Sequence, residues 1–256
     1  MKSQLVTFFS VLMLTSMSSF AIFGIGGHYA PSYGSKVDGS KSVVLNSGNG
    51  QQAVLIEKEA SPFTGFGGKV WIDAIPFIDI EASFNVQGVL YDAQLEFTGL
   101  GNLDTIMDLS IDPGIPGLGD ADPAFGILTT DLSVKYPFLE LPPGVTLLKL
   151  YVGGGYSMSL SKKLVNKEAV EKALTGIDLS SGSLDTKAIV KSLTEDLKNK
   201  DSFDQGNRFH LLVGAKFKLP VIPFAIYADG KYYFGGELPT GVTTGFTLQL
   251  GAALNI

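Results

Sequence analysis

The sequence predicts an all-β protein: an eight-stranded antiparallel transmembrane β-barrel with a helical extracellular loop. Three observations lead to this fold class. Apolar and polar residues alternate in eight segments, which is the period of a strand that separates two environments. Short and long connections alternate between these segments. Hydrophobic residues make up 45% of the chain, yet beyond the N-terminus no apolar run approaches the roughly 20 residues of a membrane-spanning helix.

The chain opens with the three parts of a signal peptide. Lys2 supplies a basic charge, residues 5–14 form a short apolar region, and Ser19 and Ala21 are small residues before a cleavage site. An N-terminal membrane anchor is the alternative, but the apolar region is short and ends in a Thr/Ser-rich stretch. We therefore expect residues 1–21 to be removed, residues 22–256 to form the barrel, and the protein to reach the bacterial outer membrane through the periplasm.

The third alternating segment gives the clearest strand signal. Its even positions are apolar, as at Ile80 and Phe84, whereas its odd positions are polar, as at Glu81 and Asn85. Seven other segments alternate in the same way, and we expect each to cross the bilayer as a tilted strand. The eight predicted strands cover residues 23–29, 66–74, 78–90, 128–136, 148–159, 208–218, 224–234 and 242–256.

The connections between these strands are of two kinds. Short ones, which contain proline, lie at 75–77, 139–145 and 219–223. Long ones lie at about 34–63, 91–124 and 161–206, and a fourth at 235–241 is brief. Outer-membrane barrels have short periplasmic turns and longer extracellular loops, so both termini are expected in the periplasm. A small hairpin with arms at 43–45 and 53–55 should extend the first long loop.

The third long loop has helical periodicity. Asn166 can cap a helix that carries Val170 and Leu174, with Gly176 as its stop signal. A second helix is expected from about 186 to 198, with apolar residues on one face. Helices this short are marginal in water. Their apolar faces should therefore pack on each other, on the barrel rim or on a partner, and we expect any extracellular or envelope protein partner to bind through the 161–206 loop.

Together, these features resemble a known family. The signal-like start, the strand-turn-strand rhythm, the Gly- and aromatic-rich strands and the amphipathic final strand 245–256 are similar to small outer-membrane barrels of the OmpA, OmpX and OmpW type. Residues 25–31 are similar to the first strand of OmpW-like barrels. The resemblance covers the mature chain, but it is one of pattern and includes no catalytic or ligand motif. It departs at Ile256, where the family usually has Phe.

A soluble eight-stranded barrel of the lipocalin kind, or a β-sandwich, would also show alternation. Such folds direct apolar side chains inward and polar ones outward. Here the polar faces carry Lys and Asp together at mid-strand, and the apolar faces carry Gly, Phe, Tyr and Leu with almost no charge. That distribution favours lipid outside and a polar lumen inside.

The inward polar faces should fill the lumen with charge. Eight strands enclose a space that side chains nearly fill, and a buried charge must be paired or hydrated. We therefore expect a network of salt bridges that plugs the barrel. Its predicted members are Lys69, Asp73, Asp79, Glu81, Asp131, Lys135, Lys149, Arg208, His210, Lys216, Lys218, Asp229 and Lys231. Glycines on the same face could instead leave a narrow water path; they are Gly153, Gly155, Gly214 and Gly251.

Other function classes have less support. His28 and His210 are the only histidines, and no Gly-x-Ser-x-Gly element accompanies them, so we do not expect an enzyme. Net charge is −6 without a basic cluster, which argues against nucleic acid. No cofactor is predicted. The second long loop has acidic residues that could hold a divalent cation, although their spacing is not that of an EF-hand and a solvated loop is the preferred interpretation. These residues are Asp104, Asp108, Asp112, Asp120 and Asp122.

Two functions follow from this fold. The first is a structural or interaction barrel, embedded in outer-membrane lipid, that displays extracellular loops above a plugged lumen. The alternative is a small porin-like channel or conduit for small polar or amphipathic solutes. The sequence names no ligand or partner for either function.

Overall fold

The computed structural model describes residues 23–46, 51–75, 77–99, 105–109, 122–141, 147–175, 203–219, 222–237, 242 and 245–255. Several expectations lie outside these residues. They are the signal peptide at 1–21, the second helix at 186–198, the stop signal at Gly176 and the departure at Ile256.

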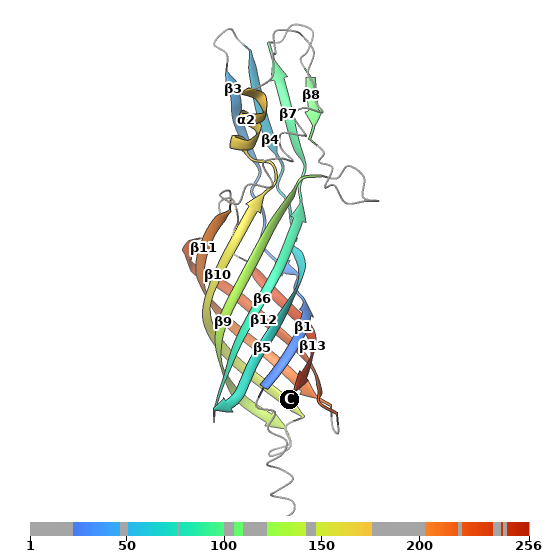
Figure 1. Ribbon diagram of the computed structural model, residues 1–256, viewed down its shortest axis with the longest axis vertical. Coiled ribbons are helices and arrows are strands. Elements are labelled where there is room, and N and C mark those ends of the chain that lie inside the picture. The colour runs from blue at the N-terminus through green and yellow to red at the C-terminus, as the bar shows by residue number, and fades with distance from the viewer. Residues whose placement is uncertain are drawn as a thin grey trace, which may run out of the picture.

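Eight strands form a closed antiparallel ring, as the alternation predicted (Figure 1). β1 pairs with β5 on one side and with β13 on the other, which closes the barrel. A two-residue strand, β2 (Ser32–Tyr33), adds to the upper end of β13. The strands of the ring are β1 (Phe23–Tyr29), β5 (Thr64–Ile75), β6 (Ile78–Leu90), β9 (Ala124–Leu141), β10 (Leu148–Lys163), β11 (Asp204–Lys218), β12 (Phe224–Glu237) and β13 (Phe246–Asn255).

The strand boundaries agree with the alternation in some places and differ in others. β6 has the predicted bounds, whereas β9 and β10 continue past their predicted ends. β13 begins at Phe246, so the prediction that this strand starts at residue 242 was wrong. Val242 is buried, and it bridges to Val37 of the first long connection. An apolar side chain at this position therefore packs inside the loops and does not face lipid.

The first and second long connections fold into a second sheet beyond one end of the barrel (Figure 1). β3 (Ser40–Asn46) and β4 (Gln52–Glu57) form the predicted hairpin. β4 also pairs with β7 (Ala93–Thr98), which pairs with β8 (Thr105–Asp108). We expected the residues of β7 and β8 to form irregular loop. β7 pairs with β4, which is more than 30 residues away in the sequence, so local periodicity gave no register for that pair. β8 joins the sheet by pairing with β7.

A helix from the third connection packs against this second sheet. α2 (Lys167–Thr175) begins as predicted, because the Asn166 side-chain oxygen accepts a hydrogen bond from the Ala169 amide at 2.8 Å. Its buried face includes Val170 and Leu174. That face joins a core cluster with β3, β4 and β7, a packing partner that the sequence analysis had not considered. We call β3, β4, β7, β8 and α2 the loop module.

The loop module and the barrel share one apolar cluster at their junction. Phe63 lies before β5 and Phe125 lies in β9, with ring centroids 5.7 Å apart. Both are about 1% exposed, and both belong to the cluster that contains Leu95 and Val170 of the loop module. The module therefore rests on the barrel rim through apolar contacts. Among the described residues, no helix is long and apolar enough to cross a membrane.

Candidate functional site

The interior of the barrel holds a layered network of charged side chains. At the lower end, near the short connections, two lysines reach carboxylates on other strands. Lys149 lies 2.7 Å from Asp79, and Lys216 lies 2.9 Å from Asp73. β5 and β11, which carry Asp73 and Lys216, lie opposite each other in the ring. The second ion pair therefore crosses the full width of the lumen.

Glu81 lies at the centre of the middle layer. Its side chain is fully buried and accepts a hydrogen bond from Lys135 at 2.7 Å. Lys69 lies 3.2 Å from it, and Lys231, which comes from the opposite wall, lies 3.6 Å from it. Lys69 also forms an ion pair with Asp229 of β12. One carboxylate thus contacts three lysines from three strands, an arrangement that holds distant parts of the ring together.

Asp131 plays a similar part in the layer above. It accepts a hydrogen bond from Lys231 at 2.8 Å and further ones from Ser83 at 3.2 Å and Tyr233 at 3.3 Å. Asp131 and Lys231 are both 0% exposed. Buried charges of this kind are tolerated only when paired and hydrogen-bonded. The Oδ2 atom of Asp131 makes all of these contacts, and Oδ1 is buried without a hydrogen-bond partner.

Both histidines lie in the lumen, and each contacts polar neutral groups. His210 is hydrogen-bonded to the Ser133 hydroxyl at 2.8 Å through one ring nitrogen and to the Ser157 hydroxyl at 2.7 Å through the other. The two serines and His210 are at most 1% exposed. A nucleophilic serine must reach its substrate, so this buried contact gives no support to hydrolysis. His28 is bound in the same way, by Tyr227 at 3.0 Å and Asn85 at 2.7 Å.

Aromatic rings fill the spaces between the charges. Trp71 is 1% exposed, and the Lys216 ammonium lies 4.7 Å from the centre of its ring. The Lys135 ammonium lies 4.6 Å from the ring centre of Tyr151, whose hydroxyl donates to Asp229. The faces of aromatic rings attract cations, so these rings stabilise the neighbouring lysines. These aromatic side chains are buried on the inward faces of their strands, and the predicted charge network did not include them.

The lumen-facing glycines make room for these rings and for neighbouring backbone. A Cβ atom on Gly214 would lie 2.6 Å from the Tyr151 ring, and one on Gly251 would lie 2.6 Å from the Tyr227 ring. Likewise, a Cβ atom on Gly153 would overlap the backbone of β9. Such approaches are too close for a side chain. These glycines therefore allow tight packing of the rings and of the neighbouring backbone.

The predicted charged residues are not all placed alike. Eleven of the thirteen are brought together by the ion pairs and hydrogen bonds described above. Lys218 is half-buried at the end of β11, and no ion pair links it to another described residue. Arg208 is buried without an ion pair to any described carboxylate. Several uncharged members were missed. The alternation could have identified them, because they occupy inward-facing positions of their strands. These residues are Trp71, Ser133, Tyr151, Ser157, Tyr227, Tyr233 and Gln249.

The acidic residues of the second long loop do not form a cation site within the described residues. Asp108, at the end of β8, accepts a hydrogen bond from Gln94 at 2.8 Å. Asp122 precedes β9. Asp104, Asp112 and Asp120 lie outside the described residues. No group of three potential ligands occurs in the part of the chain that the structure describes.

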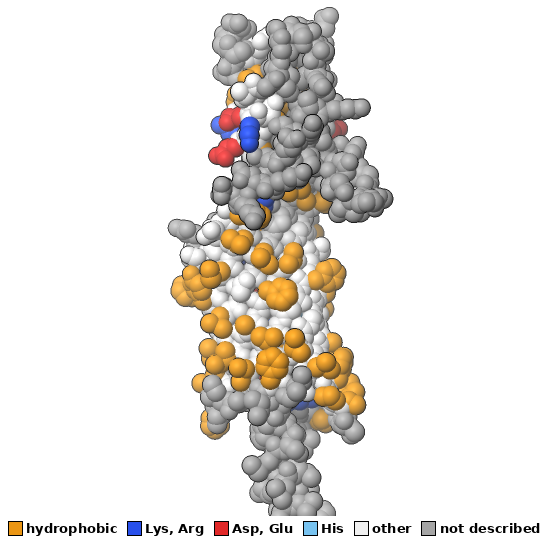
Figure 2. All heavy atoms as spheres, viewed as in Figure 1, with side chains coloured by type: hydrophobic (Ala, Val, Ile, Leu, Met, Phe, Trp, Pro, Cys, Tyr) orange, Lys and Arg blue, Asp and Glu red, His pale blue; other side chains and the backbone are white. Residues whose placement is uncertain are grey.

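The outer surface of the barrel is apolar. Outward side chains are strongly exposed, as for Phe66 at 71%, Leu211 at 59% and Leu132 at 58%. Figure 2 shows hydrophobic side chains over much of the barrel wall, with most of the charged side chains in view on the loop module above it. An apolar exterior around a polar interior is the reverse of a soluble barrel and suits strands that face lipid. This chain is a small transmembrane β-barrel of the outer-membrane type. The structure thus confirms the fold that the resemblance to OmpA, OmpX and OmpW barrels implied.

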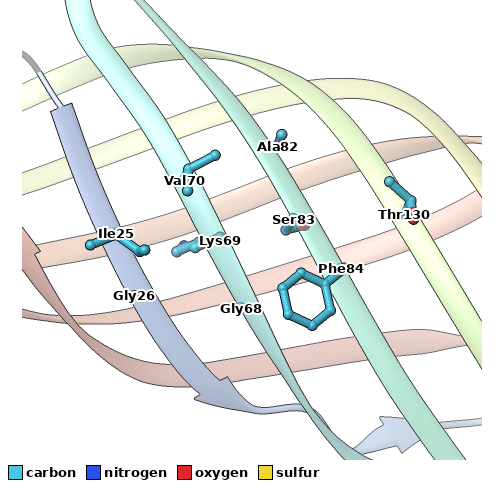
Figure 3. A pocket seen from close by; sticks show the side chains of 9 residues that line it. All are labelled: Ile25, Gly26, Gly68, Lys69, Val70, Ala82, Ser83, Phe84 and Thr130. Carbon is cyan, nitrogen blue, oxygen red and sulfur yellow. The ribbon is translucent and has the colours of Figure 1, made fainter.

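A shallow groove interrupts this lipid-facing wall (Figure 3). It has a volume of about 360 Å³ and crosses β1, β5, β6 and β9. Ile25, Val70 and Phe84 border it, and all three are lipid-facing and more than a third exposed. Gly68, which has no side chain, and Ala82, whose side chain is one methyl group, leave this space between the larger residues. It belongs to the outer surface, and the charged lumen lies behind it.

Comparisons with known proteins give structural likenesses only. No protein-family model and no curated protein matches the chain. Among solved structures, it aligns with Ail, the attachment invasion locus protein of Yersinia pestis, over 91% of this chain and 96% of that one, at 13% identity and a TM-score of 0.41. It aligns with the outer membrane protein OprG from Pseudomonas aeruginosa over 91% and 94%, at 12% identity and a TM-score of 0.44.

A third alignment, with Neisserial surface protein A, covers 91% of this chain and 97% of that one, at 13% identity and a TM-score of 0.42. Identities and TM-scores this low transfer no role from those proteins to this chain. What the barrel does is therefore argued below from its own residues.

Proposed function

We propose that this chain is exported through the periplasm to a bacterial outer membrane, where a closed barrel anchors the loop module outside the cell. The observation that carries the proposal is the pairing of charges across the lumen. Lys216 meets Asp73 at 2.9 Å, and Lys231 approaches Glu81 to 3.6 Å, each from opposite walls. A lumen bridged in this way has structural side chains where a channel needs mobile water.

The loop module supports an interaction role. The first and second long connections would not need to pair if they only joined strands, yet they form a sheet whose buried apolar core continues into the barrel rim. Leu55, Leu95 and Phe97 are at most 1% exposed within that core. Ordering so many loop residues costs conformational entropy, which the buried apolar surface offsets. A folded module on a rigid scaffold presents a fixed surface, and fixed surfaces favour specific binding.

We place the binding surface of this module on its polar side, including the part of the 161–206 loop that forms α2. The helix buries Val170 and Leu174 against the sheet, so its opposite face carries Lys167 and Glu171, which are about half exposed and 3.5 Å apart. A protein partner outside the cell would meet these charged groups first. The apolar groove on the barrel wall instead faces lipid.

Conductance in a planar bilayer tests the closed lumen. We expect the refolded chain to insert without stable stepwise currents. The variant Lys69→Ala/Asp229→Ala removes an ion pair across the lumen without leaving a lone charge, so small currents should appear only in that variant. Stable currents from the unmodified chain would contradict the closed lumen and favour the porin-like alternative.

Cysteine labelling in intact cells tests the orientation, because the chain contains no cysteine. Lys58 directly follows β4 of the loop module, and its side chain is 54% exposed. Phe77 lies in the turn between β5 and β6, at the opposite end of the barrel, and is 77% exposed. A membrane-impermeant maleimide should label Lys58→Cys in whole cells and Phe77→Cys only after lysis. The reverse pattern, or equal labelling of both variants, would reject the proposed topology.

A further inference from the structure

Among the described residues, the buried cations of the barrel outnumber its buried carboxylates by one. Each buried lysine of the lumen lies within 4 Å of a carboxylate from another strand whose side chain is at most 9% exposed, and these lysines and acids are equal in number. Lys149 also lies 3.6 Å from Glu140, whose side chain is 41% exposed. The lysines are Lys69, Lys135, Lys149, Lys216 and Lys231, and the acids are Asp73, Asp79, Glu81, Asp131 and Asp229. Arg208 is the additional cation.

Arg208 lacks the compensation that these lysines have. It is 6% exposed, and its Nε atom is buried without a hydrogen-bond partner. No carboxylate of a described residue lies within 4 Å of it, and neither histidine of the lumen forms an ion pair with a described residue. The central carbon of its guanidinium lies 4.6 Å from the ring centre of Tyr233. A cation–π contact is worth about 0.5–2 kcal/mol, whereas an unpaired buried charge costs several kcal/mol.

The backbone fixes Arg208 at this place. The pairing of β11 with β12 shifts by one residue between Asn207 and Phe209, which is a β-bulge. Gly235 and Gly236 on the facing strand have φ angles of +61° and +71°. A Cβ atom on Gly236 would overlap the Asn207 carbonyl, so only glycine lets the strands approach here. Bulges commonly redirect a side chain beside a functional site, and this one lies next to the uncompensated cation.

The groups around Arg208 suit an anion better than another cation. Arg208 is opposite Ser157 on β10, whose hydroxyl is bound to His210. Further along the same face of β10, at the register position of Asp204, Ser161 is 1% exposed and its hydroxyl has no partner. A guanidinium offers several N–H donors in a planar fork and no acceptor, and this fork matches the oxygens of an oxyanion.

We propose that the upper lumen binds a small oxyanion, with inorganic phosphate as its simplest representative, through the guanidinium of Arg208. The anion supplies the negative charge that the strands do not, and it accepts the unsatisfied N–H group. The site lies above the lysine network and meets it at Tyr233, which contacts the guanidinium of Arg208 and donates a hydrogen bond to Asp131.

Thermal unfolding of the refolded chain in detergent tests the site, with phosphate raised at constant ionic strength against sodium chloride. A ligand that binds only the folded state stabilises it by RT ln(1 + [L]/Kd). We expect the melting temperature to rise with phosphate in the unmodified chain. The rise should be absent in Arg208→Gln and retained in Lys58→Gln, which removes an exposed cation from the loop region.

A second measurement needs no variant. The ³¹P signal of phosphate should broaden when the folded chain is added and sharpen again when the chain is unfolded by boiling. In Arg208→Lys, which keeps the charge but not the planar fork, a higher phosphate concentration should be required for the same stabilisation. An equal phosphate response in Arg208→Gln and the unmodified chain, or an unbroadened ³¹P signal with the folded chain, would overturn the proposal.

Discussion

Replacing Glu81 by Gln should be among the most damaging single changes in the barrel wall. The substitution keeps the shape of the side chain and removes one negative charge from a site that is 0% exposed. Lys69 and Lys231 would each retain a second carboxylate, Asp229 and Asp131 respectively. Lys135 would not, because Glu81 is the carboxylate within 4 Å of its ammonium among the described residues.

The expected magnitude follows from that difference. Breaking a buried ion pair by removing one partner costs about 3–5 kcal/mol, chiefly because the other charge stays buried and unpaired. Removing both partners avoids that cost. The double variant Glu81→Gln/Lys135→Met replaces the ion pair with a polar and an apolar side chain, and it should recover most of the stability that Glu81→Gln loses.

Equilibrium urea unfolding of the refolded barrel in lipid vesicles measures the change in the free energy of unfolding. The folded fraction at each urea concentration is read from the gel band that shifts on heating. Lys58→Gln is the matched control. Its ion pair with Asp92 spans 3.0 Å but is more than half exposed, and such surface pairs contribute about 0–1 kcal/mol. The reasoning fails if Glu81→Gln costs no more than this control, or if the double variant is less stable than Glu81→Gln.

Three further changes test other parts of the molecule. Leu174→Ala should cost about 2–5 kcal/mol because Leu174 is 2% exposed in the shared cluster, and protease sensitivity of the loop module should rise while the barrel keeps its gel shift. Tyr91→Phe removes hydrogen bonds of 2.7 Å and 3.0 Å to Val165, so urea unfolding should show a loss of about 1–3 kcal/mol. Burial raises the pKa of Tyr91. The contribution of Tyr91 to the free energy of unfolding is therefore complete below about pH 10 and is lost as pH rises further. Tyr91→Phe should not show this loss of stability at alkaline pH. Gly251→Leu would force a side chain into the Tyr227 ring, and the temperature of the gel shift should fall.

The barrel could be predicted from the sequence because its signal is local. Alternation within a segment assigns each side chain to one face, and a closed ring needs little more than consecutive antiparallel strands. The inward placement of Lys69 or Asp131 follows from its odd or even position alone. Alternation does not give the register between strands, so it could not predict specific ion pairs such as that of Lys216 with Asp73.

The β3–β4 hairpin of the loop module was predicted, but the assembly of the module was not, because it depends on contacts between distant segments. β4 and β7 belong to different connections, and their pairing depends on where the barrel brings those connections together. Asn166 gave a local signal, and the start of α2 was predicted correctly. The helix's packing partner is a sheet that no local pattern indicated. Val242 was misassigned because an apolar residue just before a lipid-facing strand looks the same in sequence as one that packs into loops.

Paired charges across the lumen also explain how a chain with eight similar strands selects one register. A slip of a single residue would direct every lumen side chain of a strand to lipid and every lipid-facing one inward. For β12 this would place Lys231 in hydrocarbon, at a cost of about 2–4 kcal/mol near the bilayer centre, and it would leave Asp131 and Glu81 with one cation fewer. A slip of two residues keeps the faces but separates Lys231 from Asp131 by two positions along β12, so the apolar pattern permits it and the ion pairs do not. Alternation assigns the face of each side chain, and the ion pairs then select the register of the strands. The register in turn determines where the barrel rim lies and where the loop module packs on it.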